Sequence, residues 1–319
     1  MNYRGTLFTL CLFASACAGA QPYPAKSIRI VTGFAAGGPT DIYARLIGQK
    51  LTAAWGQPVI VDARPGASGN IAAEHVAKSP ADGYTLYVPF GTHTVNPSLY
   101  SKSPYDPIKD FTMVTLIAKQ YNALVVHPSI PAKSVKELLA LAKAQPRKLS
   151  YGSSGNGSPN HLGMELLKQI TGVDMVHVPY KGAAPSRIDL LGGHLELMFD
   201  VLRTALPFRD TGRIRMLAVG ALQRQVIAPD VPTLDELGYK GMEVLTWHAL
   251  LAPAGTPKVI ADRLQTETRR GMTVPAFKEK LLRDGIDVIT GTPAELETFL
   301  RADIEKWRKV IQTAKIRLD

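Results

Sequence analysis

Short β-branched runs alternate with segments of helical spacing along almost the whole chain of 319 residues. The run 27–34 (SIRIVTGF) is strand-like, and residues 41–55 place their apolar side chains on one helical face. A second series of this kind starts near residue 122, and the C-terminal part is helical. The alternation predicts an α/β fold with parallel strands and helices on both faces. The length allows two cores of ordinary size.

No flexible or low-complexity linker separates the two series. The chain leaves the first series near residue 122 and returns through the apolar run 245–251 (LTWHALL). We therefore expect a discontinuous first domain of residues 21–121 and 243–319, and a second domain of residues 122–242. Domains joined by strands leave a cleft between them, and α/β proteins bind ligands in such clefts.

The formal net charge of +10 suggests an anionic partner, but the basic residues are scattered. The densest groups are pairs such as Arg269–Arg270, without a longer basic run. Nucleic-acid-binding proteins usually concentrate their charge on one stripe with interleaved aromatic residues. We therefore expect no nucleic-acid partner, and the composition gives no sign of a disordered or polytopic membrane chain.

Residues 1–20 have the pattern of a secretory signal peptide. Arg4 precedes an apolar run that is too short for a bilayer span, which takes about 20 residues. Ala18-Gly19-Ala20 then forms an A-x-A cleavage site. The sequence before Cys17 is a poor version of a lipoprotein box, so a lipid anchor at Cys17 is the alternative. Because Cys11 and Cys17 are the only cysteines, the mature chain would contain none.

Two glycine-rich loops, 33–41 (GFAAGGPTD) and 152–161 (GSSGNGSPNH), each join a predicted strand to a predicted helix. Pro39 and Pro159 suit the first helical position, where no N–H is needed. The glycines leave backbone N–H groups unobstructed, and the helix dipole adds partial positive charge. If both loops face one cleft, they suit a ligand with carboxylates. Glycine and proline also make ordinary tight connections, and 180–185 (YKGAAP) is a third loop of this kind.

Neither loop completes a known catalytic pattern. Pro39 stands where a Walker A motif requires lysine, and Asn160 replaces the third glycine of a dinucleotide fingerprint. The sequence has no G-x-S-x-G elbow and no H-E-x-x-H motif. We therefore expect a binding protein rather than an enzyme, with no metal and no cofactor. A secreted α/β hydrolase is the rival interpretation, as is a sensor subunit that presents its ligand to a membrane kinase.

Longer stretches carry a more specific pattern, among them VTGFAAGGPTDIYARLI, RPGASGNIAAEHVAKSPADGYTL, LSYGSSGNGSPNHLGMELL and VHVPYKGAAPSRIDLLGGHLELMFD. In this order and spacing the chain resembles the periplasmic solute-binding receptors of tripartite tricarboxylate transporters, the Bug family, from about residue 23 to about residue 311. The resemblance implies a two-domain periplasmic binding protein, a type II-like clamp with the ligand cleft between its lobes. It also implies a periplasmic protein that delivers a small organic carboxylate to membrane permease subunits. We expect it to act as a monomer.

In such receptors the two loops hold the ligand's carboxylate, largely through backbone amides and ordered water. The segments 92–93 and 180–182 would complete the rim, and Asp200 matches a frequent cleft position. The ligand-binding residues that the resemblance implies are Phe34, Ala36, Gly37, Gly38, Asp41, Thr92, His93, Ser153, Ser154, Gly155, Gly157, Ser158, His161, Tyr180, Lys181, Gly182 and Asp200.

Several implied residues also have an ordinary structural interpretation. Asp41 lies in the first turn of a predicted helix, where a carboxylate stabilises the helix dipole, and we favour that role. His161 donates to a ligand or is a solvated or hydrogen-bond-satisfied histidine, and Lys181 neutralises a distal carboxylate or is an exposed loop lysine. Because a side chain at Gly38 or Gly157 would block backbone N–H groups, valine at either position should weaken binding without weakening the fold.

Three departures from the family pattern leave the ligand open. Ala63 replaces a common Asn, Ala249 a frequent Gly and His248 a frequent aromatic residue. A dicarboxylate, an aromatic carboxylate such as a phthalate, and an amino acid are all compatible with the sequence. The amino acid is the least favoured, because its ammonium group would need an acidic partner and only Asp41 and Asp200 are available.

Overall fold

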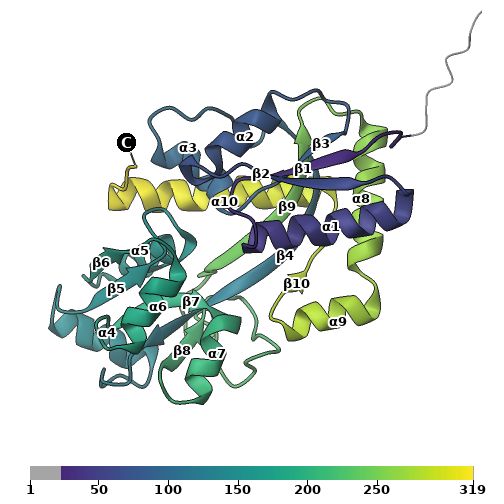
Figure 1. Cartoon of the computed structure of the whole chain (residues 1–319). Helices are drawn as coiled ribbons and strands as arrows, with labels where there is room; N and C mark the ends of the chain where they lie inside the picture. Colours follow the sequence, from purple (N-terminus) through teal and green to yellow (C-terminus); the bar gives the residue numbers. More distant parts are fainter. Residues whose placement is uncertain (1–22, 319) are drawn as a thin grey trace, which may run out of the picture.

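The computed structural model describes residues 23–318. The expected signal peptide and the alternative lipid anchor at Cys17 lie outside the described residues. Figure 1 shows two lobes of α/β structure, with residues from both ends of the chain in the first lobe and the middle of the chain in the second. The expected two-lobed α/β fold is therefore confirmed.

The first lobe contains a parallel core of three strands, in which β1 pairs with β2 and with β3. Helices cover it on both faces (Figure 1). Its strands are β1 (Ile28–Thr32), β2 (Val59–Ala63), β3 (Thr85–Val88), part of β4 (Phe111–Val126), β9 (Leu245–Pro253) and β10 (Asp287–Val288), and its helices are α1 (Pro39–Trp55), the short η1 (Ala67–Gly69), α2 (Asn70–Ala77), α3 (Thr92–Leu99), α8 (Lys258–Met272), α9 (Pro275–Arg283) and α10 (Pro293–Ala314).

The second lobe repeats the parallel arrangement, because β5 pairs in parallel with β6 and β7. Its helix α4 begins at a serine cap, since the Ser134 side chain accepts the N–H of Glu137 at 3.2 Å. Its strands are the rest of β4, β5 (Ser150–Ser153), β6 (Val176–Pro179), β7 (Leu197–Val201) and β8 (Arg215–Val219), and its helices are α4 (Val135–Ala144), α5 (Pro159–Thr171), α6 (Ala183–Leu191) and α7 (Leu202–Asp210).

Strand β4 passes from one lobe into the other and joins the strands into one sheet of order β2-β1-β3-β9-β4-β7-β5-β6. It pairs antiparallel with β9 up to the pair Tyr121↔Leu245, and with β7 and β8 from Asn122 and Ala123 onward. The sheet is therefore mixed, not parallel throughout as the alternation predicted. The residues around Asn122 form the floor between the two lobes.

Each lobe has its own apolar core. In the first, Ile30, Ile47 and Leu86 are fully buried between α1 and the sheet. In the second, Leu124 and Phe199 lie under α4 and α5. A smaller cluster belongs to both lobes, because it joins side chains of α3, α5 and α10; its buried members are Val95, Leu99, Leu162, Trp307, Val310 and Ile311.

Candidate functional site

The first glycine-rich loop, residues 33–41 and here called the first-lobe loop, ends in the first turn of α1. Gly37 has a φ of +81° and donates its N–H to Asp41 Oδ2 at 3.0 Å. The same oxygen accepts a 2.8 Å bond from Arg45 Nε, which lowers the pKa of the Asp41 carboxyl below its usual value. Gly38 is the N-cap and Pro39 the first helical residue, as the sequence predicted.

The second-lobe loop, residues 152–161, is built in the same way. Gly157 has a φ of +74° and donates its N–H to His161 Nδ1 at 3.0 Å. Ser158 is the N-cap in extended conformation and Pro159 opens α5. Asn160 Oδ1 accepts bonds from the backbone N–H and hydroxyl of Ser154 and from the hydroxyl of Ser158, at 2.7–3.2 Å.

Both loops leave helix N-terminal amides without a carbonyl partner. The first N–H groups of any α-helix have no intrahelical acceptor, and each proline removes one of them. Gly38 and Ser158 bond back to the carbonyls of Ala35 and Gly155, at 3.3 and 3.2 Å. The first-turn amides of the residues that follow the prolines therefore remain to bind an anion.

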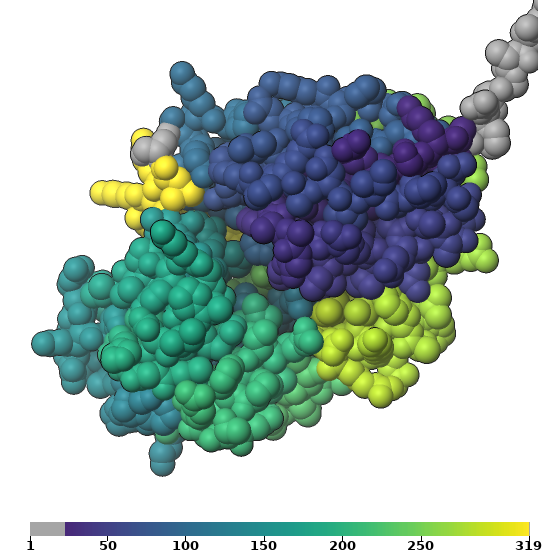
Figure 2. All heavy atoms as spheres, viewed as in Figure 1, coloured from purple at the N-terminus to yellow at the C-terminus, as the bar shows by residue number. Residues whose placement is uncertain are grey.

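The two loops border one interlobe cleft with a cavity volume of about 390 Å³. Figure 2 shows the surface recessed where the purple-blue first lobe meets the teal-green second lobe. Every lining residue is uncharged at neutral pH, and none is His or Cys. The lining residues are Phe34, Ala35, Ala36, Gly38, Pro39, Thr40, Phe90, Gln120, Asn122, Ser154, Pro159, Asn160, Ala183, Val201 and Thr246.

Only part of the implied ligand-binding set lies in this lining. The residues found there are Phe34, Ala36, Gly38 and Ser154. Seven others shape the two loops without lining the cavity, namely Gly37, Asp41, Ser153, Gly155, Gly157, Ser158 and His161.

The implied rim residues of the first lobe, Thr92 and His93, each bond to a backbone carbonyl of their own lobe. The Thr92 hydroxyl donates to the Ser68 carbonyl at 2.8 Å. His93 is buried and bonds through Nε2 to the Pro107 carbonyl at 3.1 Å. Its ring stacks on Tyr105 at 5.1 Å, and burial lowers the pKa of His93 to about 4. The structure thus places His93 in the aromatic core of the lobe, outside the lining.

The implied rim of the second lobe is similarly engaged. Tyr180 donates its hydroxyl to Asp189 at 2.6 Å, and burial raises the pKa of Tyr180 to about 12. Lys181 is exposed, and Gly182, with a φ of +116°, is the N-cap of α6. Asp200 is fully buried against Arg187, with the two bonds at 2.5 and 2.7 Å. None of these four residues lines the cavity.

Sequence reasoning missed the cleft floor. Gln120 and Asn122 lie on β4, and Thr246 on β9 is the cross-strand partner of Gln120. Phe90, which follows β3, packs edge-on against Phe34 with ring centroids 5.1 Å apart. Gln120, Asn122 and Thr246 carry no motif, because they enter the site only through the pairing that brings β4 and β9 together.

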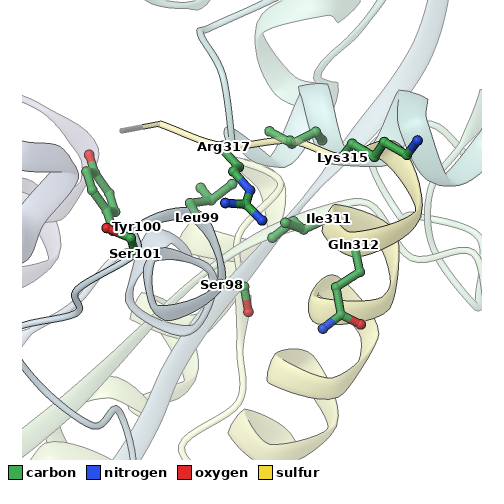
Figure 3. A pocket seen from close by; sticks show the side chains of 9 residues that line it. Ser98, Leu99, Tyr100, Ser101, Ile311, Gln312, Lys315 and Arg317 are labelled. Atoms are coloured by element: carbon green, nitrogen blue, oxygen red, sulfur yellow. The ribbon is translucent and has the colours of Figure 1, made fainter.

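A larger cavity, of about 620 Å³, lies between the C-terminal ends of α3 and α10 (Figure 3). Its lining includes Leu99, Tyr100, Lys315 and Arg317, and none of the implied ligand-binding residues. We assign the candidate site to the smaller interlobe cleft, because only there do the two glycine-rich loops meet.

The side chains that could bind a metal ion are scattered over residues 23–318. Over that part of the chain, no three His, Cys, Asp or Glu side chains gather closely enough to hold a metal ion. In the same range, no helix has the length and apolar character that a membrane crossing requires.

The fold and the cleft define a two-lobed solute-binding protein of the periplasmic class, and comparison with known proteins gives the family. Residues 43–316 match the model of the tripartite tricarboxylate transporter family receptor. The chain belongs to this family, as the sequence predicted. It is similar to the protein BugT of Bordetella pertussis, at 32% identity over the full length of both chains. It is also similar to a Pseudomonas protein encoded in a tcbD-tcbE intergenic region, at 36% identity over 91% of this chain and 86% of the relative.

Solved structures agree with this assignment. An R. palustris protein with adipate shares 40% identity, with a TM-score of 0.80 over 92% of this chain and 99% of the other. MatC of Rhodopseudomonas palustris, solved with bound malate, shares 32% identity, with a TM-score of 0.76 over 91% and 100% of the two chains. Relatives of the family are solute-binding receptors rather than enzymes.

Proposed function

We propose that this protein captures a small organic carboxylate in the interlobe cleft and delivers it to membrane permease subunits. The observation that carries the proposal is the meeting of two equally built loops on one cleft. Each contributes a helix N-terminus, with its partial positive charge and unpaired first-turn amides. Such donors hold an anion without a charged side chain.

The uncharged lining supports binding without chemistry. None of its residues is an Asp, Glu, His, Lys or Cys that could serve as a general base or an activated nucleophile. Among the lining residues that belong to the second-lobe loop, Ser154 alone has a hydroxyl group. Its Oγ donates to Asn160 Oδ1 at 2.8 Å. We therefore infer a receptor and not a hydrolase.

The carboxylates of Asp41 and Asp200 are already paired within the protein, and this restricts the class of ligand. An amino acid needs an acidic partner for its ammonium group, but Asp41 bonds Gly37 and Arg45, and Asp200 bonds Arg187. We therefore propose a dicarboxylate or an aromatic carboxylate. The two R. palustris proteins were solved with dicarboxylates, adipate and malate, and this chain shares the family and fold of both proteins.

The remaining assignments are part of the same proposal. The protein acts as a periplasmic monomer, secreted by a cleavable signal peptide. Its first domain comprises residues 21–121 and 243–319, and its second domain residues 122–242. The boundaries lie where the chain passes between the lobes, in β4 and just before β9. The residues proposed to contact the ligand are the implied residues Phe34, Ala36, Gly38 and Ser154, with Phe90, Gln120, Asn122, Asn160 and Thr246 added from the cleft lining. The other implied residues are proposed to support the loops and the rim.

A thermal-shift screen tests the proposal. Mono-, di- and tricarboxylates, among them adipate, malate, benzoate and phthalate, are compared with their neutral amides. A ligand at about 100 times its Kd adds about 2.7 kcal/mol to the free energy of unfolding, which raises the Tm measurably. We expect at least one carboxylate to raise the Tm and its amide to leave it unchanged. A rise with only sugars or amides would refute the carboxylate assignment.

A further inference from the structure

Two stacked histidines, His161 and His177, bond to the second-lobe loop. His161 Nδ1 accepts the N–H of Gly157 at 3.0 Å, and His177 Nε2 lies 2.7 Å from the Ser153 hydroxyl. The two rings stack with centroids 3.8 Å apart and an interplanar angle of 10°. The pair of imidazoles thus holds the loop at Ser153 and at Gly157.

The Gly157 bond defines the chemical state of His161. A backbone N–H can only donate, so Nδ1 must carry a lone pair, and the neutral ring then bears its proton on Nε2. His161 is buried, and it is not among the residues that line the cleft. Its effect on a ligand would therefore be exerted through the loop.

We propose that His161 is a positioning residue for ligand binding, whose neutral ring holds Gly157 and so keeps the first turn of α5 presented to the cleft. This inference rests on the proposed function and deepens it, because it names the side chain that supports the second-lobe loop of the same site. Protonation at Nδ1 removes the acceptor and releases the loop.

The first-lobe loop is held by a different acceptor. Its equivalent acceptor is the Asp41 carboxylate, which also binds Arg45. That pairing lowers the pKa of Asp41, so the carboxylate remains an acceptor when the solution is moderately acidic. His161 is kept in its accepting, neutral state by burial instead, so the two loops keep an acceptor in place by different means.

The groups around His161 come from three elements. His177 lies on β6 and Tyr151 on β5, while Glu165 and Lys168 lie on α5 itself. Glu165 already binds the Tyr151 hydroxyl and, at 2.8 Å, the Lys168 ammonium. Burial lowers the pKa of His161 to about 3 and that of His177 to about 4. Both rings are thus neutral near neutral pH. The loop loses its acceptor at His161 only when the pH approaches these values.

Two substitutions at one position test the proposal. His161→Asn keeps an acceptor oxygen on the equivalent side-chain atom but cannot take up a proton, whereas His161→Leu removes the acceptor. His194→Asn, at an exposed histidine, is the matched control. Hydrogen exchange of the Gly157 amide is measured by NMR without ligand, and affinity is measured for adipate, malate and benzoate.

We expect His161→Leu to speed exchange of the Gly157 amide and to weaken carboxylate binding, each by about tenfold, the effect of about 1.4 kcal/mol. His161→Asn and His194→Asn should stay close to the native protein in both.

Unchanged Gly157 exchange in His161→Leu would overturn the proposal, as would unchanged affinity in that variant. Equal losses in the His161→Leu and His161→Asn variants would also overturn it, since a purely steric role of the ring would then explain both. If no carboxylate bound the native protein, the proposed function would fail, and the exchange of the Gly157 amide would still decide the role of His161.

Discussion

Asp41 and His161 are structural counterparts: each is the third residue of its helix, and each accepts the N–H of a glycine four residues earlier at 3.0 Å. The two lobes therefore present the same loop geometry with two different acceptors. In both, the acceptor satisfies one glycine amide and leaves the first-turn amides of the helix unpaired. A carboxylate between the lobes would meet equivalent donors on its two sides.

The two glycines that precede the helices should respond differently to valine. A Cβ at Gly157 would lie 2.3 Å from Leu99 Cδ1 of the first lobe, and the φ of +74° is strained for valine. At Gly38 the φ is −77° and the nearest obstacle is the Ala35 carbonyl at 3.3 Å. This corrects the sequence-based expectation that both substitutions spare the fold.

We expect Gly157→Val to lower the Tm strongly, because packing strain in a close contact typically costs about 1–3 kcal/mol and the backbone strain adds to it. Gly38→Val should stay folded and lose carboxylate affinity, because its side chain enters the cleft. Thermal unfolding and calorimetric titration of both variants check this. Equal Tm values would contradict the steric argument.

The ion pair of Arg187 with Asp200 should matter for stability and not as a direct ligand contact. Asp200→Asn leaves the largely buried guanidinium without its carboxylate, and breaking a buried pair costs about 3–5 kcal/mol. The double substitution Arg187→Met with Asp200→Leu removes both charges and should recover much of this loss. Urea unfolding measures the free energy of unfolding of both variants. If the Asp200→Asn variant were as stable as the native protein, the pair would contribute nothing to stability.

Buried histidines should make the fold acid-sensitive. Burial lowers the pKa of His93 to about 4 and that of His248 to about 3, against about 6.5 in an unfolded chain. Between these values the unfolded state binds protons that the folded state does not. The free energy of unfolding should therefore fall as the pH falls from about 6.5 toward about 4, by about 1.4 kcal/mol per pH unit for each such histidine.

Urea unfolding between about pH 7 and about pH 4.5 measures this slope. His248→Phe, which keeps a flat ring beside Tyr43, removes one titrating group and should reduce the slope by about one proton. A slope that is unchanged in this variant would mean that His248 is not neutral in the folded protein.

Phe90 should contribute affinity through the apolar body of the ligand. It lines the cleft and packs against Phe34 at 5.1 Å. We expect Phe90→Ala to weaken adipate binding by about tenfold and malate binding by less, because adipate buries more apolar surface. Phe208→Ala, at a half-buried phenylalanine of α7 outside the lining, is the control. Equal losses in the two variants would argue against contact with the ligand.

Local signals in the sequence were sufficient for most elements and for the two loops. The Ser134 cap and Thr292 capping box mark the starts of α4 and α10, and Pro39 and Pro159 mark those of α1 and α5. Helices α3 and α7 were not predicted, because Pro97 and Pro207 lie inside them and proline usually ends a helix.

The rest of the site depends on long-range pairing. Gln120 and Thr246 lie 126 positions apart in the sequence, and they become neighbours only when β4 and β9 pair. The burial of His93 likewise depends on stacking with Tyr105 and on the Pro107 carbonyl. A single sequence contains no periodicity that reports such contacts, so the loops could be predicted and the floor between them could not.

Helix N-terminal amides of both lobes are proposed to hold the ligand's carboxylate, and this contact can be measured directly. An NMR titration with adipate, malate and benzoate reports on each backbone amide separately. We predict that the backbone N–H signals of Thr40, Asp41, Asn160 and His161 shift together with one binding constant. The uncharged carboxamide derivatives of adipate, malate and benzoate should cause no such shift. Shifts confined to one lobe, or centred on the cavity near Arg317, would contradict the account.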